Sequence, residues 1–196
     1  MTATRSALER LQLALDERRL VRIARSLPFA DDDDVYILAI GAKWFLTVKV
    51  VDGGYFDGFH AMRMRDVKKV SRKKFFDEQL STQLNVWPPE LPAQPIDLDS
   101  TSSLLATVGA NDVIFGVEKE RQRRAMWIGV LHGVHEGTLW LRELDVKARW
   151  GTRPVSYKLS KITSVSWGGR YMGALELSAG ERPAYPPRLE ESATQP

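Results

Sequence analysis

The sequence predicts a mainly β protein in which two small β-barrels follow one another, each preceded by a short helix. Two observations lead to this prediction. A strand, a tight break and a second strand occur in "MRMRDVKKV" (62–70) and again in "YKLSKITSV" (157–165), so that Met64 aligns with Leu159. In both places this pattern ends a run of short strand-like segments that begins with a helical segment. Such a repeat indicates an internal duplication of one helix-plus-barrel unit.

The first unit is expected at residues 1–80. Its helix is predicted where Leu8, Leu11 and Leu15 fall on one face, with charged residues away from it. The segments that follow are short and rich in β-branched and aromatic residues, and tight turns separate them, which is typical of antiparallel strands. The expected elements are a helix at 5–18, strands at 20–26, 35–40 and 44–51, a turn at 52–54, the strand–break–strand at 55–70 and a closing helical turn at 73–80.

The linker between the units is expected at 81–100, where the prolines of "WPPELPAQP" prevent regular hydrogen bonding. Trp87 in this stretch is expected to hold the linker in the groove between the barrels. The second unit, 101–179, repeats the first, and 180–196 is polar and proline-rich, as disordered tails are. The expected elements are a helix at 100–109, strands at 112–120, 125–133 and 138–144, an exit loop at 145–154, the strand–break–strand at 155–165 and a closing turn that contains Tyr171 and Leu175.

This order of one helix and five short strands, with a tight turn before the last strand, resembles the Sm-like fold, an SH3-like small barrel. "MRMRDVKKV" and "YKLSKITSV" are similar to the second Sm motif, and residues 35–52 are similar to the hairpin of the first. The chain resembles tandem Sm-like proteins of an uncharacterised bacterial type, which implies a fold and no activity. The uridine-binding residues of the family are mostly replaced, because "AKWF" stands at 42–45 and Asp66 follows Arg65 where the family has glycine.

The composition is that of an ordinary globular protein: of 196 residues, 43% are apolar and 27% are charged. The absence of cysteine excludes disulfides, thiolate metal sites and cysteine nucleophiles, and it fits a reducing compartment. The sequence has no signal-like N-terminal segment and no uninterrupted apolar run of about 18 residues. We therefore expect a cytoplasmic protein with no membrane partner.

No catalytic residue, metal ligand or cofactor is expected, and the protein is predicted not to be an enzyme. His132 and His135 have the spacing of two metal ligands, but only Glu136 and Asp145 are close enough in sequence to complete a site. A turn with two solvent-facing imidazoles is the simpler interpretation. No serine lies in a G-x-S-x-G context, and no phosphate-binding glycine loop is present.

The acidic run "DDDD" at 31–34 is expected to belong to a loop, 27–34, because Pro28 and four consecutive aspartates fit poorly into a strand ladder. Consecutive residues of an extended chain point to opposite sides, whereas calcium loops use alternating ligands and a glycine turn. We therefore expect a solvated loop that offsets the positive charge of the basic cluster, and no cation site.

The strongest candidate for a binding surface is basic. The net charge is only +3, yet basic residues crowd the stretch from His60 to Lys74, with Arg63 and Arg65 expected on the solvated face of their strand. Cations of this kind bind phosphates without reading sequence, and aromatic side chains at loop tips stack on bases. The same pattern also suits an ordinary solvated strand face. The candidate nucleic-acid site comprises Arg63, Arg65, Lys68, Lys69, Arg72, Lys73 and Lys74, with Tyr55 and Trp150 as its aromatics.

Two functions are compatible with these features. The first is a non-enzymatic interaction or scaffold module that binds another protein, or a second copy of itself, through the strand edges that a bent small barrel leaves free. The second is the binding of RNA or another nucleic acid through the basic face of the first barrel.

The resemblance also bears on these edges, because Sm-type rings form when the fourth strand of one barrel pairs with the fifth strand of the next. The edge at 162–167 is uncharged, so it is expected to be covered, by the first barrel or in a homodimer. The lysine-rich edge at 67–74 is expected to be open. The two barrels are expected to superpose as separate sheets.

Overall fold

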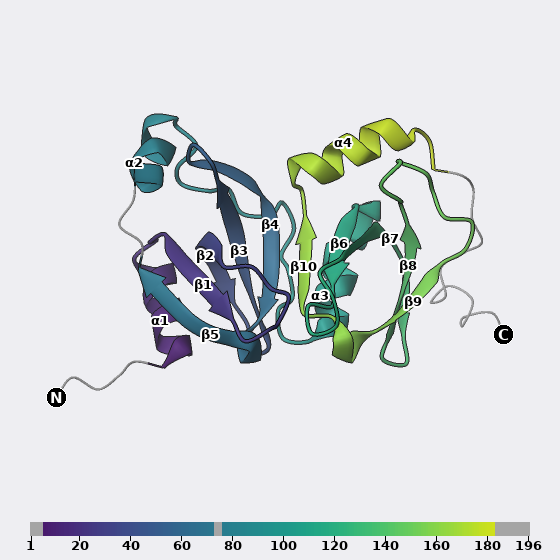
Figure 1. The fold of residues 1–196 in the computed structure, drawn as a ribbon, viewed down its shortest axis with the longest axis horizontal. Helices are drawn as coiled ribbons and strands as arrows, with labels where there is room; N and C mark the ends of the chain where they lie inside the picture. The colour runs from purple at the N-terminus through teal and green to yellow at the C-terminus, as the bar shows by residue number, and fades with distance from the viewer. Residues whose placement is uncertain (1–5, 73–75, 183–196) are drawn as a thin grey trace.

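The computed structural model describes residues 6–72 and 76–182, so the tail predicted at 180–196 lies outside the described residues from 183 onward. The fold is mainly β, as the sequence predicts: the described strands form one antiparallel sheet of ten (Figure 1). None of the described helices has the length and apolar character needed to cross a membrane. The strands are β1 (Val21–Arg25), β2 (Asp33–Ile40), β3 (Trp44–Val51), β4 (Tyr55–Arg63), β5 (Val67–Arg72), β6 (Phe115–Glu118), β7 (Met126–His135), β8 (Thr138–Glu143), β9 (Val155–Lys158) and β10 (Ser164–Trp167). The helices are α1 (Ala7–Asp16), α2 (Phe76–Gln83), α3 (Thr101–Val108) and α4 (Arg170–Ala179), with 3-10 turns η1 (Met64–Asp66), η2 (Ala110–Asp112) and η3 (Leu159–Lys161).

Both halves begin with a helix whose start is set by a serine. At α1 the Ser6 hydroxyl accepts a hydrogen bond from the N–H of Glu9 (3.2 Å), and the Glu9 carboxylate accepts one from the N–H of Ser6 (2.6 Å). At α3 the Ser100 hydroxyl accepts from the N–H of Ser103 (3.0 Å). Because these caps satisfy N–H groups that have no partner inside the helix, the two serines define where the helices begin.

The two halves have the same strand order. Along the sheet the strands run β5-β1-β2-β3-β4 and then β10-β6-β7-β8-β9. The register repeats as well, since Ile23 of β1 pairs with Val70 of β5, and Val117 of β6 pairs with Val165 of β10. The bulge between β2 and β3 recurs between β7 and β8, and the tight break recurs as η1 and η3. The predicted duplication is therefore present in strand order and in register.

The halves do not form two separate sheets. β10 pairs with β6 on one side and with β4 on the other, so that one open sheet runs through both halves, with β4 and β10 side by side at its middle (Figure 1). The expectation of two separate, closed barrels is corrected by this continuous, open sheet. The physical reason is that β10 is uncharged and completes its second hydrogen-bond ladder with β4.

The predictions for the two edges fit this arrangement. The 162–167 edge was expected to be covered either by the first barrel or in a homodimer. It is covered by the first half, because β10 pairs with β4. In the described part of the chain, β5 is the last strand at one end of the sheet and β9 is the last at the other. The predicted open edge, 67–74, is described as far as Arg72.

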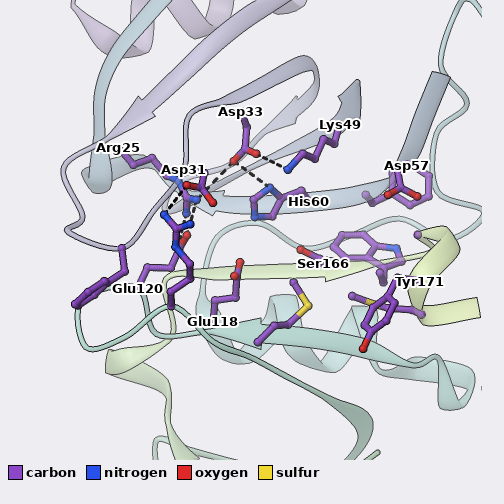
Figure 2. Close-up of a pocket in the computed structure, with 17 residues that line it drawn as sticks. Arg25, Asp31, Asp33, Lys49, Asp57, His60, Glu118, Glu120, Ser166 and Tyr171 are labelled. Carbon is purple, nitrogen blue, oxygen red and sulfur yellow. Dashed lines mark hydrogen bonds and ion pairs between the residues drawn. The ribbon is translucent and has the colours of Figure 1, made fainter. Parts of the chain in front are cut away.

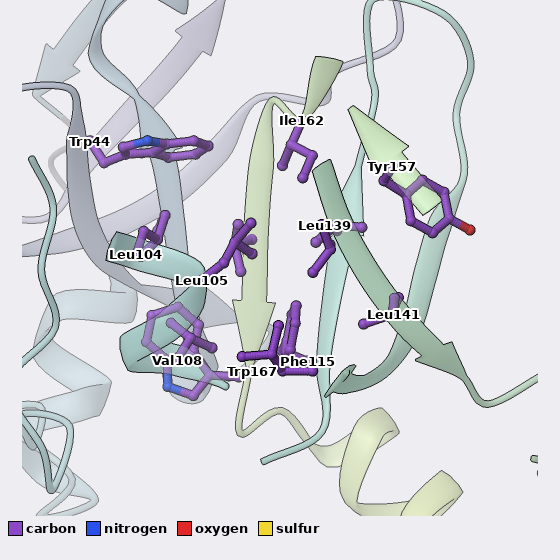
Figure 3. Packing of buried hydrophobic residues seen from close by; sticks show 14 of the residues in the cluster. Trp44, Leu104, Leu105, Val108, Phe115, Leu139, Leu141, Tyr157, Ile162 and Trp167 are labelled. Atoms are coloured by element: carbon purple, nitrogen blue, oxygen red, sulfur yellow. The ribbon is translucent and has the colours of Figure 1, made fainter. Parts of the chain in front are cut away.

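The largest core lies across the junction between the halves (Figure 3). Trp44 of β3 and Ala61 of β4 belong to it from the first half. Leu104 and Leu105 of α3 and Val165 of β10 join them from the second half, and all of these side chains are fully buried. Because the halves share this cluster, neither buries all of its apolar surface without the other.

The chain between α2 and α3 contains no helix or strand, yet it packs on the protein. Leu98 is buried in the junction core, and its carbonyl oxygen accepts a hydrogen bond from the N–H of Trp44 (3.0 Å). Trp87 packs on Tyr36, with 4.5 Å between ring centroids, in a small cluster of the first half. The expectation that Trp87 holds the linker in a groove between the halves is therefore wrong. Leu98 is the linker residue that reaches their shared core.

Candidate functional site

The structure removes Arg63 from the predicted nucleic-acid surface. Its side chain is only 8% exposed, donates a hydrogen bond to the carbonyl oxygen of Leu159 (2.6 Å), and lies 5.0 Å from the ring centre of Trp44. Burial, and then the charge of Arg65, lower the pKa of Arg63 to about 10. The strand face that was expected to be solvated is covered by α3 and η3 of the second half. Arg63 is thus a structural link between the halves.

The two aromatic residues of that predicted surface lie apart from its cations. Trp150 is half-buried in a cluster of the second half, where the guanidinium carbons of Arg142 and Arg182 each lie 5.5 Å from its ring centre. Tyr55 is exposed at the start of β4, whereas the basic residues lie at and beyond the opposite end of that strand. The predicted residues that the structure describes therefore do not form one surface.

Four of the predicted cations are exposed at the edge of the sheet, in η1 and β5. Because β5 is the last strand on its side within the described chain, this group forms a basic edge and not a basic face. Lys73 and Lys74 lie outside the described residues. The exposed cations are Arg65, Lys68, Lys69 and Arg72.

A different group of polar side chains lies at the junction, on the side of the sheet opposite to the shared core. Residues paired directly in β4, β10 and β6 present their side chains to the same face, and alternate rows face opposite ways. The row centred on Val165 belongs to the junction core. The rows beside it contain His60 paired with Ser166, and Ser164 paired with Glu118. The junction therefore has one apolar face and one polar face.

A buried ion pair connects the halves beside this polar face. Arg25, at the end of β1, donates to both carboxylate oxygens of Glu120 at 2.5 and 2.6 Å, and the two side chains are 2% and 4% exposed. Glu120 is also held from its own half, because the Thr163 hydroxyl donates to it at 2.9 Å. A bidentate pair of this kind offsets its desolvation cost only while the geometry is complete. It fastens β1 to the segment that follows β6.

Asp33 is the acidic centre on the first-half side of this network. Its carboxylate lies 2.8 Å from Nζ of Lys49, 3.6 Å from Nη2 of Arg25 and 3.9 Å from Nδ1 of His60. Burial by itself would raise the pKa of Asp33. The positive charges of His60 when protonated, of Lys49 and of Arg25 outweigh burial and lower it. Asp33 is therefore a carboxylate that its neighbours keep ionised.

The acidic run is divided between a loop and a strand. The expectation of a loop over 27–34 is wrong for Asp33 and Asp34, which open β2 and pair with β1. The guanidinium of Arg22 donates to both carboxylate oxygens of Asp34, at 2.8 and 2.7 Å. Cationic partners on neighbouring strands thus bring these aspartates into the ladder, because a paired carboxylate is tolerated where an unpaired one is not.

A cavity of about 230 Å³ opens onto the polar face between the two halves (Figure 2). It is smaller than the roughly 300–1,000 Å³ of drug-sized ligand sites, so it suits a small molecule or a single side chain. Helix α4 begins beside it, where the Asp57 carboxylate accepts a hydrogen bond from the N–H of Arg170 (2.8 Å). Its aromatic and thioether lining comprises Phe29, Phe59, Trp167, Tyr171, Met126 and Met172.

His60 and Glu118 have hydrogen-bonding capacity left for a ligand in the cavity, as do the hydroxyls of Ser166 and Tyr171 that line it. His60 is 7% exposed, and no group in the described chain hydrogen-bonds to its Nε2. Burial lowers the pKa of His60 to about 4, so the ring is neutral at pH 7. Glu118 is half-buried and accepts a hydrogen bond from the Ser164 hydroxyl (2.7 Å). Burial, and then repulsion from Glu120, raise the pKa of Glu118. Figure 2 shows His60 and Glu118 on opposite sides of the same space.

The remaining predicted site residues do not join this cavity. His132 and His135 both lie in β7 and not in a turn; His132 is half-buried, and His135 is exposed with Nε2 3.4 Å from a Glu136 carboxylate oxygen. Across the ranges that the structure describes, no three His, Asp or Glu side chains are grouped as a metal ion would require. No family model matches the chain, and no curated protein or solved structure is significantly similar to it.

Asp31 and Asp33 belong to the acidic run that was not expected to form a cation site, and the other polar residues of the cavity were not among the candidates that the sequence indicates. One local signal could have pointed to them: Glu118 and Glu120 are two residues apart at the end of a predicted strand, and this spacing places them on one side of it. Their partners Arg25 and Thr163 are distant in sequence, so no motif connects them. The cavity is a product of the junction between the halves.

Proposed function

We propose that this protein is a non-enzymatic binding module made of two Sm-like units, and that its binding site is the cavity between them. The observation that carries the proposal is the pair of groups left over in that cavity. Nε2 of His60 is buried without a hydrogen-bond partner in the described chain, and the Glu118 carboxylate faces the same space. A buried polar atom of this kind costs free energy unless a ligand or a water satisfies it.

The repeated strand order supports the Sm-like part of the proposal. Each half runs as strands 5-1-2-3-4, and a 3-10 turn separates the fourth strand from the fifth. The halves meet through β4, the fourth strand of one, and β10, the fifth strand of the other. This is the contact through which Sm-type barrels join in rings, so the second unit takes the place of a neighbouring subunit.

The state of the other charged groups supports binding in preference to catalysis. Arg25 is held by Glu120, and Lys49 is held by Asp33, within direct ion-pair distance. Groups fixed in this way shape and charge the cavity, whereas general acid–base catalysis requires a group that exchanges a proton with the substrate. We therefore propose a site that positions a ligand without transforming it.

Methyl NMR of selectively labelled methionines tests the proposal. Met126 and Met172 line the cavity, whereas Met62 is buried in the core of the first half. Small-molecule fragments should shift the Met126 and Met172 signals and leave Met62 unchanged. The variant Ser166→Phe, which fills the cavity from β10, should abolish these shifts. If no fragment of any charge moves the two cavity signals, the junction cavity is not a binding site.

The basic sheet edge favours a second candidate function, nucleic-acid binding. In the repeat, β5 has Lys69 where β10 has Ser164, and Arg72 where β10 has Trp167. The outer edge, β5, therefore lacks the uncharged surface through which β10 pairs with β4. It is for this reason poorly suited to self-association through the same kind of strand pairing. Its row of cations suits a phosphate backbone. Salt-dependent binding to a nucleic acid, lost when the β5 cations are removed, is the test of this candidate.

A further inference from the structure

We infer that the junction cavity binds a small organic cation, an ammonium or guanidinium group carried on an apolar body. The group would be held by Glu118 and His60, with its apolar part against the aromatic and thioether lining. This inference rests on the proposed function, since it assumes that the cavity is a binding site, and it adds the chemical class of the ligand. Three properties of the cavity support it, namely its charge balance, its hydrogen-bond acceptors and its apolar wall.

The charge balance of the lining leaves one carboxylate without a direct ion pair, and Lys49 and Arg25 act on it only at longer range. Three cations line the cavity, and each lies within ion-pair distance of a carboxylate of its own: Arg25 with Glu120, Lys49 with Asp33 and Arg124 with Asp31. A fourth lining carboxylate, Asp57, is engaged with Arg170 at the start of α4. This leaves Glu118, for which the described chain supplies a hydroxyl donor and no ion-pair partner.

The two available groups that are not hydroxyls, on His60 and Glu118, are acceptors; the Ser166 and Tyr171 hydroxyls, which also line the cavity, can donate or accept. Nδ1 of His60 faces the Asp33 carboxylate, 3.9 Å away, so the neutral ring is assigned its proton on Nδ1. Nε2 is then an acceptor, and the Glu118 carboxylate is an acceptor as well. A ligand that bridges them must donate at least two hydrogen bonds, as an ammonium with three N–H groups does. An anion offers acceptors only and would be repelled by Glu118.

The wall of the cavity suits the apolar part of such a ligand. Phe59 and Trp167 border the cavity, but their rings, with 5.5 Å between centroids, belong to the junction core on the other face of the sheet. Tyr171 lines it from α4, and Met126 and Met172 add two thioethers. Aromatic faces attract cations, and methionine side chains adapt to irregular apolar shapes. The lining therefore fits an organic cation better than a bare metal ion, which prefers oxygen ligands.

Three probes of the same size and different charge test the inference on the wild-type protein: cyclohexylammonium, cyclohexanol and cyclohexanecarboxylate at pH 7.5. Binding is followed through the Met126 and Met172 methyl signals. We expect the ammonium to bind at least about tenfold more tightly than the alcohol, as a charge-assisted hydrogen bond predicts, and the carboxylate to bind most weakly. Glu118→Gln should bring the ammonium and the alcohol to within about twofold. Glu136→Gln, an exposed carboxylate that follows β7 at the end opposite to Met126, is the control and should keep the preference.

The outcomes separate this inference from the proposed function. Three results would overturn the inference that the ligand is an organic cation and would still leave the cavity as a binding site. They are equal binding of the three probes, a preference for the alcohol or the carboxylate, and a cation preference that survives in Glu118→Gln. No shift with any probe would overturn both. A lysine-containing tetrapeptide distinguishes two sources of the ammonium group. Tighter binding of the peptide than of cyclohexylammonium assigns it to a partner protein, and the reverse order assigns it to a free metabolite.

Discussion

Arg25 and Glu120, which belong to different halves of the chain, form a buried bidentate ion pair at 2.5 and 2.6 Å. The pair is reinforced by the backbone, since the carbonyl oxygen of Glu120 accepts a hydrogen bond from the N–H of Phe29 (3.2 Å). On the opposite face of the sheet, the fully buried Val165 joins the halves by apolar packing. The junction is thus held by charge on one face and by hydrophobic contact on the other.

Breaking this ion pair should be strongly destabilising. Arg25→Met leaves the Glu120 carboxylate buried without its cation, and we expect a loss of about 3–5 kcal/mol in the free energy of unfolding, measured by urea denaturation. The double variant Arg25→Met with Glu120→Leu should recover most of this loss, because neither charge is then left alone. Arg124→Ala is the control, since its pair with Asp31 is exposed (69% and 67%) and should contribute at most about 1 kcal/mol. An unchanged urea midpoint for Arg25→Met would contradict the prediction.

Stability should carry a contribution from His60 that is lost as the pH falls. Burial lowers the pKa of His60 from 6.5 to about 4, so below pH 6.5 the unfolded chain takes up a proton that the folded protein does not. The contribution is complete above pH 6.5 and decreases by about 3 kcal/mol in all as the pH approaches 4. Urea unfolding of wild type and His60→Gln across this range measures the difference.

The contribution of Glu118 to stability changes with pH in the opposite direction to that of His60. Comparing wild type with His60→Gln cancels the Glu118 contribution. The raised pKa of Glu118 means that the folded protein binds a proton before the unfolded chain does, so its contribution grows as the pH falls toward 4.5. Both proteins share this effect, and their difference reports His60 alone. Parallel stability curves for the two proteins between pH 6.5 and 4.5 would show that His60 titrates normally.

A charge placed in the junction core should unfold the protein, whereas loss of a charge at the open edge should not. Val165 is fully buried between β4 and β6, and Val165→Lys is expected to cost more than about 4 kcal/mol, because an unpaired charge is then buried. Ile162→Lys should behave in the same way. Lys69→Ala, at an exposed position of β5, should change stability by at most about 0.5 kcal/mol. Thermal melting and light scattering on the three variants test this prediction. Unchanged melting and unchanged mass for all three would show that the 162–167 edge is not covered.

Nucleic-acid binding by the basic edge should follow the number of cations removed. The triple variant Lys68→Gln, Lys69→Gln, Arg72→Gln should reduce the slope of log affinity against log salt by about 2 to 3, since each phosphate contact contributes about 0.7–0.9. Fluorescence anisotropy with a single-stranded oligonucleotide at several salt concentrations measures the slope. A matched control removes exposed cations of the second half, Lys147→Gln, Arg153→Gln and Lys158→Gln, and should leave the slope unchanged. An unaltered slope in the β5 variant excludes this surface.

Much of the fold could be predicted because its signals are local. The alternation of Met62 and Met64 with basic residues, and its return at Tyr157 and Leu159, indicated the strands, the break and the duplication. The absence of charge from β10 indicated a covered edge, because an exposed edge strand is usually protected by charge. What failed was the interpretation of Arg63, since alternation tells which side chains share a face and not whether that face meets water or the other half.

The sequence by itself determined the local elements of this protein: where helices begin, which segments are strands, and that one unit is written twice. Only the tertiary structure decided that the two units share one sheet and one core, and that a polar cavity lies between the halves. It also decided that Asp33 is a buried residue of β2 and not part of a solvated loop. The physical reason is that strand and helix signals arise from neighbours in sequence. A buried charge such as Asp33 or Glu120 is stable only beside partners from distant segments, and those partners become neighbours when β4 pairs with β10.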